Sequence, residues 1–392
     1  MRPMMKPALR RAWRDRQSVQ FGVTPERAMT VGPLDTATGS LVDLLDGTRG
    51  MELLRAEARA RGLPEGRADA LVRRLADAGL LDDTGPATSP AAGALRGRAA
   101  AVERLRPDLA SLSLVHPEPG GAFARMGGRR SARVLVRGAG RVGAAIAATL
   151  SAAGIGQVEV RDGGVTEPGD TAPGGIGPEE TGERRDAAAR RLVRRSAPDR
   201  PPRATAAGAG ATAGAGAREP CLSLVVVAPR DGLGAYAPDP VIAQGWVAGG
   251  IPHLYAGVVE ATGVVGPLVL PGATPCAECL ERTRTERDPA RGMLLAQWRS
   301  GGRRAVPPAC DTALASAVAG LAACHALSFV DGDLPGSTGA RWEVSLPAGG
   351  WRRERVAAHP DCLCGASRAG GEAHSGGEGA SARREAQGTM AG

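Results

Sequence analysis

The chain has 392 residues, enough for two or three domains, and its aromatic content of only 3% requires cores of mainly aliphatic side chains. The formal net charge of +8 comes from arginine, because Lys6 is the only lysine. A single lysine excludes P-loop and Schiff-base enzymes, since both need a lysine within a folded core. The arginine excess has no aromatic interleaving and no dense basic run, so we expect no nucleic-acid partner.

Neither an export signal nor a membrane span is expected. Residues 1–20 are rich in arginine and lack the apolar segment of a secretory signal. The longest apolar stretch, Ala313–Val330, is short for a bilayer and is bracketed by Asp311 and Asp331, which favours a buried helix. We therefore expect a cytoplasmic protein with no membrane partner.

Residues 18–83 are expected to form a small winged-helix-like α+β domain after an N-terminal extension over residues 1–17. Ser18–Val23 and Ala28–Val31 predict two short strands, and regularly spaced leucines predict three helices after them. DNA binding is the obvious alternative for such a domain. The last helix, however, alternates arginines with acidic residues, which is typical of a solvated face rather than one that grips phosphate.

Three stretches are expected to lack a core of their own. Residues 84–130 have weak periodicity and predict a linker with one helix over Leu105–Val115. Residues 196–220 consist largely of Ala, Gly and Pro, which predicts a flexible insertion. Residues 366–392 predict a disordered tail, so the second domain is expected over residues 131–365.

A nucleotide-binding motif opens this second domain. The strand Arg133–Arg137 leads into a turn with Gly138, Gly140 and Gly143, and Asp162 follows nineteen residues after the last glycine, behind a helix and a second strand. Glycines let the backbone approach phosphate, a helix N-terminus offers free N–H groups, and the acid can bind ribose hydroxyls. The alternative is a Rossmann-like core in which the turn serves packing alone.

A third strand, Cys221–Val227, ends shortly before Asp231. Ligands gather at the carboxyl ends of parallel strands, so Asp231 is a candidate to hold a metal–phosphate group. An aspartate that caps the loop before Gly232 is the equally plain alternative.

Four of the seven cysteines form two close pairs, Cys276 with Cys279 and Cys362 with Cys364. Four thiolates are what a tetrahedral structural zinc site needs, and the absence of an export signal favours metal ligands over disulfides. Such a site would tie the end of the folded chain to its middle. Four unrelated buried or free cysteines are the alternative. The remaining cysteines, Cys221, Cys310 and Cys324, are scattered.

Together with Gly250-Ile-Pro and the run from Gly266 to Gly272, these motifs resemble the ThiF family, the superfamily of ubiquitin-activating and molybdopterin-adenylating enzymes. The resemblance covers about Ala132–Gly365. It implies an α/β fold, a Rossmann-type mostly parallel sheet with helices on both faces, in a homodimer. It also implies an enzyme that uses ATP and Mg to adenylate the C-terminal carboxylate of a small carrier protein or peptide.

The resemblance assigns residues with some departures. By this resemblance, Gly138, Gly140, Gly143 and Asp162 would bind the nucleotide. Arg185 stands where the family has a lysine, and Asp231 stands near the place of the magnesium-binding acid. The stretch Glu167–Pro173 lacks the arginine that the family usually carries there. In some relatives a cysteine before the Ala-rich helix accepts the activated group; Cys310 stands there, where a helix dipole lowers a thiol pKa, unless it is only a small packed residue.

The N-terminal unit is similar to peptide-recognition modules of ribosomally made peptide pathways. Fused to a ThiF-like domain, such modules occur in partner proteins of azoline-forming cyclodehydratases, where they add a leader peptide as a strand. These ThiF-like domains are often catalytically reduced. Two hypotheses follow: an adenylyltransferase, or a non-catalytic protein that binds a precursor peptide beside a cyclodehydratase partner. A third, an NAD-dependent oxidoreductase, leaves the cysteine pairs unexplained.

Overall fold

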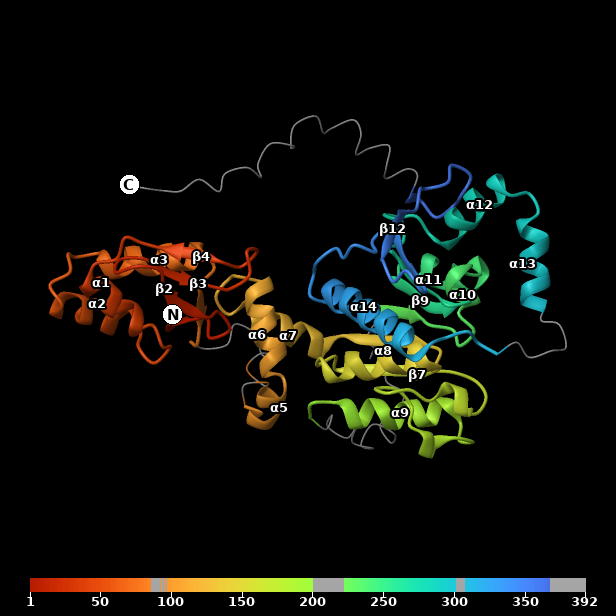
Figure 1. Ribbon diagram of the computed structural model, residues 1–392, viewed down its shortest axis with the longest axis horizontal. Coiled ribbons are helices and arrows are strands. Elements are labelled where there is room, and N and C mark those ends of the chain that lie inside the picture. The colour runs from red at the N-terminus through yellow and green to blue at the C-terminus, as the bar shows by residue number, and fades with distance from the viewer. Residues whose placement is uncertain (86–92, 94, 96, 200–221, 301–306, 367–392) are drawn as a thin grey trace, which may run out of the picture. The chain divides into compact units, whose positions relative to one another are not determined.

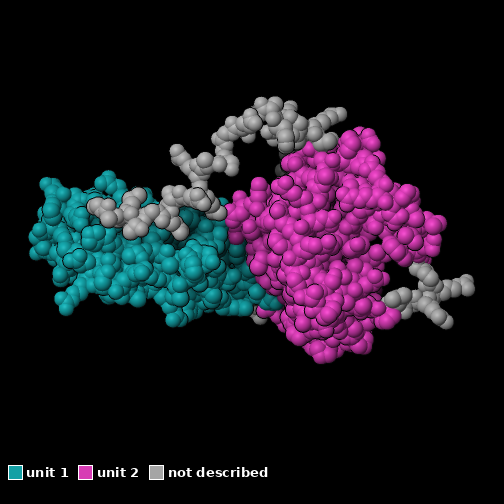
Figure 2. Space-filling view, turned by 45° about the horizontal axis from the view of Figure 1, so that its top comes forward, with its two compact units in different colours: residues 1–132, 151–157, 196–214 teal, residues 133–150, 158–195, 215–392 magenta. Residues whose placement is uncertain are grey.

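The computed structural model describes residues 1–85, 93, 95, 97–199, 222–300 and 307–366. Nearly all of the expected flexible insertion and disordered tail, as well as Cys221, lie outside these residues. The chain divides into two compact units (Figure 2). The first contains Met1–Ala132, and the second contains Arg133–Leu150, Val158–Arg195 and the chain from Ala215 onward.

The first unit begins with a small sheet and a two-stranded ribbon (Figure 1). The sheet has the antiparallel order β2-β3-β4, and β1 pairs with β5. Their bounds are β1 Pro3–Met5, β2 Arg11–Trp13, β3 Val19–Phe21, β4 Met29–Val31 and β5 Leu81–Asp83. The two expected strands are thus present as β3 and β4. Residues 1–17 are no separate extension, because β1 and β2 lie in them; all three β2 residues are exposed, so no alternation of apolar residues marks this strand.

Three helices follow the small sheet, as the leucine spacing predicts: α1 Thr36–Asp43, α2 Met51–Ala60 and α3 Arg67–Asp77. The side chain of Asp35 caps α1 by accepting from the N–H of Thr38 at 2.6 Å. Leu41, Leu54 and Leu75, one from each helix, are almost completely buried in a common core. The apolar face of each helix, rather than its intrinsic propensity, therefore fixes this unit.

Lys6 corrects one premise of the sequence analysis, because this sole lysine does lie in a folded core. It is 2% exposed, and its Nζ donates to the carbonyls of Ser113 and Pro117, the latter at 2.9 Å. Burial lowers the pKa of its ammonium group. Because its ammonium group is buried and donates to these two backbone carbonyls, we assign Lys6 a structural role and still exclude a lysine-based mechanism.

From residue 97 onward, the stretch expected as a linker with one helix contains α5 Ala99–Arg104, α6 Arg106–Val115 and α7 Gly121–Ser131. The expected helix is α6. A separate hydrophobic cluster holds the three together through Leu105, Leu112 and Met126. Short helices with few apolar residues give weak periodicity, and only their mutual packing orders them.

The second unit is built on a seven-stranded sheet of order β12-β11-β10-β9-β8-β6-β7. The pairs β6–β8 and β8–β9 are parallel, and β9 to β12 continue antiparallel. The strands are β6 Arg133–Arg137, β7 Gln157–Arg161, β8 Leu224–Val227, β9 His253–Val259, β10 Thr262–Val269, β11 Ala340–Ser345 and β12 Arg352–Arg355. The expected Rossmann-type α/β fold is confirmed.

The helices of this unit are α8 Arg141–Ala152, α9 Arg185–Ser196, α10 Leu233–Tyr236, α11 Pro240–Ala248, α12 Ala277–Arg287, α13 Arg291–Ser300 and α14 Thr312–Val330, with short 3-10 turns at Pro168–Asp170 and Pro178–Glu180. Helices cover both faces of β9. A Cβ on Gly257 would lie 2.9 Å from Ala235 in α10, whereas one on Gly263, the cross-strand partner of Val258, would lie 2.4 Å from Val318 in α14. Since consecutive strand residues point to opposite faces, α10 and α14 lie on opposite sides.

Among the described residues, α14 is long and apolar enough to cross a membrane by length and composition. Its buried residues recur at the spacing of one helix face, from Leu314 to Ala326, and it packs on β9 and β10 (Figure 1). A helix with one face on a sheet is a core element, which agrees with the expected buried helix.

Candidate active site and cysteine cluster

A cleft opens in the second unit at the carboxyl ends of β6 and β8. Its described lining consists of Gly140, Arg141, Val142, Gly143, Gly169, Asp170, Pro229, Arg230, Val258, Pro308 and Cys310. Two of the predicted nucleotide residues, Gly140 and Gly143, line it together with the first turn of α8. The carboxyl edge of a parallel sheet is where ligands of this fold class bind.

The glycine turn is required by close backbone approach. Gly138 has a φ of 110°, and a Cβ there would lie 1.9 Å from the carbonyl oxygen of Ala228. A Cβ on Gly143 would lie 2.2 Å from the carbonyl oxygen of Gly138. Only glycine fits at either position, so close packing alone is enough to explain Gly138 and Gly143. A phosphate-binding role is compatible with this packing, because the first turn of α8 lines the cleft.

Asp162 and Arg185 form a largely buried pair outside the described lining of the cleft. Asp162 accepts a hydrogen bond of 2.6 Å from the N–H of Ala139 and contacts the Nε of Arg185 at 3.2 Å. Arg185 is buried, donates to the carbonyl of Gly163 and reaches Asp170 at 3.2 Å. Neither Asp162 nor Arg185 is among the described residues that line the cleft. In this conformation Arg185 holds two acids in place rather than facing a ligand.

Asp170 and Arg230 are charged residues of the cleft lining, and Arg230 lies beside the glycine turn. The buried carboxylate of Asp170 contacts the Nε of Arg230 at 2.5 Å and accepts from the N–H of Glu167 at 2.9 Å. The same guanidinium reaches Glu167 at 2.5 Å. The neighbouring carboxylates raise the pKa of Arg230 against the opposing effect of its burial, so it stays a cation.

The structure places the two remaining candidates differently. Asp231 is exposed and is not among the described cleft residues. Cys310 does line the cleft, and its carbonyl accepts from Arg141 at 2.8 Å. The expected lowering of its pKa is wrong, because burial raises the pKa of this thiol. The helix N-terminus is capped instead by Asp311, whose carboxylate accepts from Ala313 at 2.8 Å.

Neither the place of Arg230 in the cleft nor the anchoring role of Asp170 was predicted from the sequence. A cation directly after a buried strand, beside the glycine turn in a parallel sheet, was the available indication of Arg230. The pairing of Asp170 with Arg185 and Arg230 joins segments 15 and 60 residues apart, which no spacing rule predicts.

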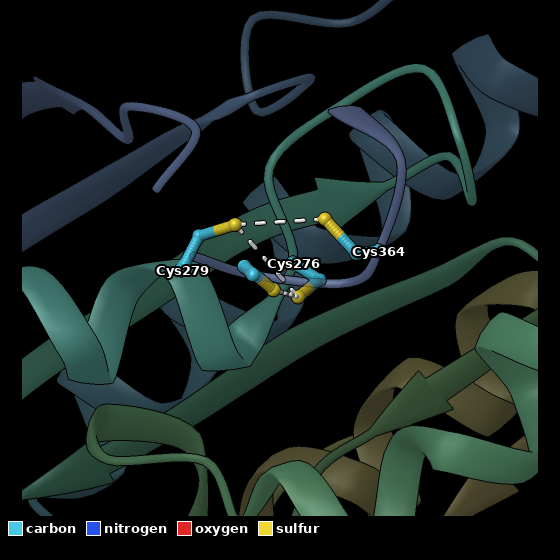
Figure 3. Close-up of side chains that lie close together, drawn as sticks. Cys276, Cys279 and Cys364 are labelled. Atoms are coloured by element: carbon cyan, nitrogen blue, oxygen red, sulfur yellow. Dashed lines mark hydrogen bonds between the residues drawn. The ribbon is translucent and has the colours of Figure 1, made fainter. Parts of the chain in front are cut away.

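The four paired cysteines converge, as predicted. All four sulfur atoms lie within 4.8 Å of one another, and Figure 3 shows those of Cys276, Cys279 and Cys364 pointing together. The Sγ of Cys276 lies 4.0 Å from that of Cys279 and 3.6 Å from that of Cys362, and the sulfurs of Cys279 and Cys364 are 3.6 Å apart. Four sulfurs bound to one tetrahedral zinc at 2.3 Å would be about 3.8 Å apart. The cluster can therefore hold a metal ion such as zinc.

The chemistry of the cluster also fits a metal. The hydrogen bond from Cys276 lowers the pKa of Cys279 to about 4, and the same contact raises that of Cys276. Burial raises the pKa of Cys362 to about 12. Packing four sulfurs in a partly buried site is costly unless a cation offsets their charge as thiolates.

His359 supports the cysteine turn without pointing at the sulfurs. It is buried, its Nδ1 accepts from the N–H of Asp361 at 3.2 Å, and its Nε2 lies 2.8 Å from a carboxylate oxygen of Glu286. An acceptor at Nδ1 leaves the proton on Nε2, which donates to Glu286 at the end of α12. Its carbonyl also accepts from Cys362.

The comparisons with known proteins agree with this geometry. The model of the ThiF family matches residues 126–366. No curated protein matches the chain by sequence. Among solved structures, E. coli MccB with MccA-N7isoASN is 15% identical with a TM-score of 0.64, and covers 93% of this chain and 99% of its own. E. coli MccB with ATP is 15% identical, with a TM-score of 0.63 and coverage of 92% and 99%. PaaA is 18% identical, with a TM-score of 0.63 and coverage of 90% and 99%. At these identities the likeness concerns the fold.

Proposed function

Because the chain belongs to the ThiF family, with residues 126–366 matching, we propose that it is an adenylyltransferase that activates the C-terminal carboxylate of a small carrier protein or peptide with ATP. The observation that carries the proposal is the cleft at the carboxyl edge of the sheet, where Gly140 and Gly143 offer backbone and a helix N-terminus to phosphate. MccB, which shares the fold, is crystallised with ATP and with MccA-N7isoASN.

In the proposed reaction, a carboxylate oxygen of the peptide attacks the α-phosphorus of ATP. The bond from that phosphorus to the bridging oxygen breaks, and pyrophosphate leaves. The chain would contribute binding and electrostatics: the glycine turn orients the phosphates, Asp162 holds the ribose, and cationic side chains offset the charge that develops. Asp231 remains the proposed ligand of the magnesium ion that accompanies ATP, and Arg185 keeps the acids in position.

ATP–pyrophosphate exchange tests the proposal. Exchange of labelled pyrophosphate into ATP that depends on an added peptide or carrier supports it, because only a reversible adenylation returns the label to ATP. The matched control is the same substrate with its C-terminal carboxylate amidated, which should abolish exchange. If every candidate peptide binds but none raises the rate of pyrophosphate exchange above the background without peptide, the proposed enzymatic activity is contradicted.

A second function rests on the first unit. We infer that its β2-β3-β4 sheet can bind a precursor peptide as an added strand, because β2 and β4 are edge strands with unpaired backbone groups. The core of the unit packs against one face of this sheet, through Val19, Phe21 and Val31. A peptide added at an edge would therefore leave these core contacts unchanged. Peptide binding without pyrophosphate exchange would make the protein a recognition partner, for example of a cyclodehydratase.

Peptide binding is measured with a fluorescent precursor peptide and the full chain. A proline placed in the β4 edge, Thr30→Pro, should weaken binding if the peptide pairs there, since proline removes an N–H donor. Arg11→Pro tests the β2 edge in the same way, because the bonds Gly22 N–H to Arg10 and Arg14 N–H to Ser18 place the Arg11 N–H on the side of β2 away from β3. Equal affinity for both variants and the wild type would contradict strand addition.

We also propose that the four cysteines bind one zinc ion with a structural role. Four protein ligands leave no open position for a substrate, which separates this site from a catalytic zinc. Cys276 is the N-cap of α12, while Cys362 and Cys364 lie on the turn after His359, so the metal would fasten the end of the fold. The family resemblance adds a homodimer, which light scattering on the purified protein tests directly.

A further inference from the structure

The described lining of the cleft contains two cations, Arg141 and Arg230, that no motif assigned. We propose that Arg230 binds the polyphosphate of the nucleotide and that it exchanges Glu167 and Asp170 for phosphate oxygens when the nucleotide enters. The proposal rests on the proposed nucleotide site and names the side chain that would supply the positive charge in it. It accounts for the stretch Glu167–Pro173, which lacks an arginine, with an arginine from a different strand end.

The first argument is position. Arg230 follows β8 at the carboxyl edge of the sheet and lines the same cleft as Gly140 and Gly143. A Cβ built on Gly140 would lie 3.1 Å from the Cγ of Arg230, so the arginine stem stands directly against the glycine turn. Phosphates bound by that turn would lie within reach of this guanidinium. Arg185, in contrast, is 8% exposed and contacts Asp162 and Asp170.

The second argument is that the present partners of Arg230 can release it. Asp170 keeps the Nη1 of Arg185 at 3.2 Å and the N–H of Glu167 at 2.9 Å when Arg230 leaves. The Glu167 side chain is 55% exposed, so water replaces the arginine there. Ion pairs with an exposed partner are weak, and a guanidinium binds phosphate through two parallel charge-assisted hydrogen bonds.

The third argument is that the other cation in the lining is already occupied. Arg141 donates to the carbonyls of Gly169 and Cys310, both at 2.8 Å, and reaches the hydroxyl of Thr312. These contacts fix the rim of the cleft, and breaking them would leave backbone carbonyls unpaired. Arg230 binds only carboxylates in the described contacts, so it is the side chain that a competing anion can displace.

The test compares ATP with adenosine, because only ATP carries the phosphates. Affinities of both are measured by titration calorimetry on the full chain, for the wild type and for Arg230→Gln, Arg230→Lys and Glu167→Gln. Arg190→Gln is the control, since Arg190 is 55% exposed on α9, pairs with Asp186 and is not among the described residues of the cleft lining. We expect Arg230→Gln to weaken ATP at least about tenfold, the equivalent of losing one hydrogen bond to a charged group, with adenosine affinity changed less than about twofold.

The two other variants give opposite results. Arg230→Lys keeps the charge without the forked geometry and should recover part of the ATP affinity. Glu167→Gln removes a competing partner and should tighten ATP binding by about two- to threefold. Equal ATP affinity in Arg230→Gln and the wild type, or an equal loss of ATP and adenosine affinity, would overturn the assignment while leaving the nucleotide site intact. A wild type that binds neither ligand would overturn the nucleotide site itself.

Discussion

Replacement of Asp170 by alanine should unfold the second unit at markedly lower denaturant. The Asp170 side chain is 3% exposed and pairs with Arg185, which is 8% exposed, and with the partly exposed Arg230. Removing one member of a buried ion pair costs about 3–5 kcal/mol, because it leaves an uncompensated charge away from water. In the variant, Arg185 retains its contact with Asp162, so we expect a loss at the lower end of this range, about 3 kcal/mol in the free energy of unfolding. At a slope of about 3 kcal/mol/M, this lowers the urea midpoint by about 1 M.

The assay is urea unfolding followed by tryptophan fluorescence in a Trp13→Phe background. The other four tryptophans, at positions 246, 298, 342 and 351, belong to the second unit, so the signal reports that unit alone. Asp186→Ala is the control, because the arginines that pair with Asp186 are more than half exposed and should contribute about 1 kcal/mol or less. Adding Arg185→Met to Asp170→Ala should cost less than the sum of the two by at least about 1 kcal/mol. An Asp170→Ala variant within about 0.5 kcal/mol of the wild type would refute the buried-network reasoning.

The remaining predictions concern the glycine turn and the cysteines. Gly143→Ala should destabilise the second unit by about 2 kcal/mol, since its Cβ would meet the Gly138 carbonyl at 2.2 Å. Gly320→Ala, with open space around it in α14, should stabilise the unit by up to about 1 kcal/mol. Urea midpoints measure both changes, and an equal midpoint for Gly143→Ala and the wild type would contradict the close approach. Elemental analysis should find the metal in the wild type and in Cys324→Ser, a change at an exposed thiol of α14, but not in Cys362→Ser. Equal metal content in Cys362→Ser and the wild type, or a wild type without metal, would argue against the cluster. Burial raises the pKa of Cys310, so its thiolate forms only above the ordinary cysteine range; mass-spectrometric mapping of iodoacetamide labelling should show half-maximal reactivity above about pH 8.5, and labelling already complete at pH 7 would contradict it.

Local sequence patterns were sufficient to predict the structure of a segment where the residues that determine it lie close together in the chain. The order of strand, glycine turn, helix, strand and acid at residues 133–162 has a chemical reason at each step, and it matches the structure. The same holds for α1 to α3, whose leucines mark one buried face each, and for the cysteine pairs, since two close pairs supply the four thiolates that a tetrahedral metal needs. Failures came from strands without alternation, such as β2, and from helices such as α5 and α7 that only their neighbours order.

The sequence by itself therefore determined the fold class, the glycine turn and the cysteine cluster that can hold a metal ion, because each of these depends on residue type and short spacing. Tertiary structure decided which charges face the cleft. Arg185 had the chain position of a phosphate ligand, yet it is buried between Asp162 and Asp170, while Arg230 lines the cleft beside Gly140. The direction of a long side chain depends on which carboxylates the fold brings within about 4 Å, and segments distant in sequence supply those carboxylates.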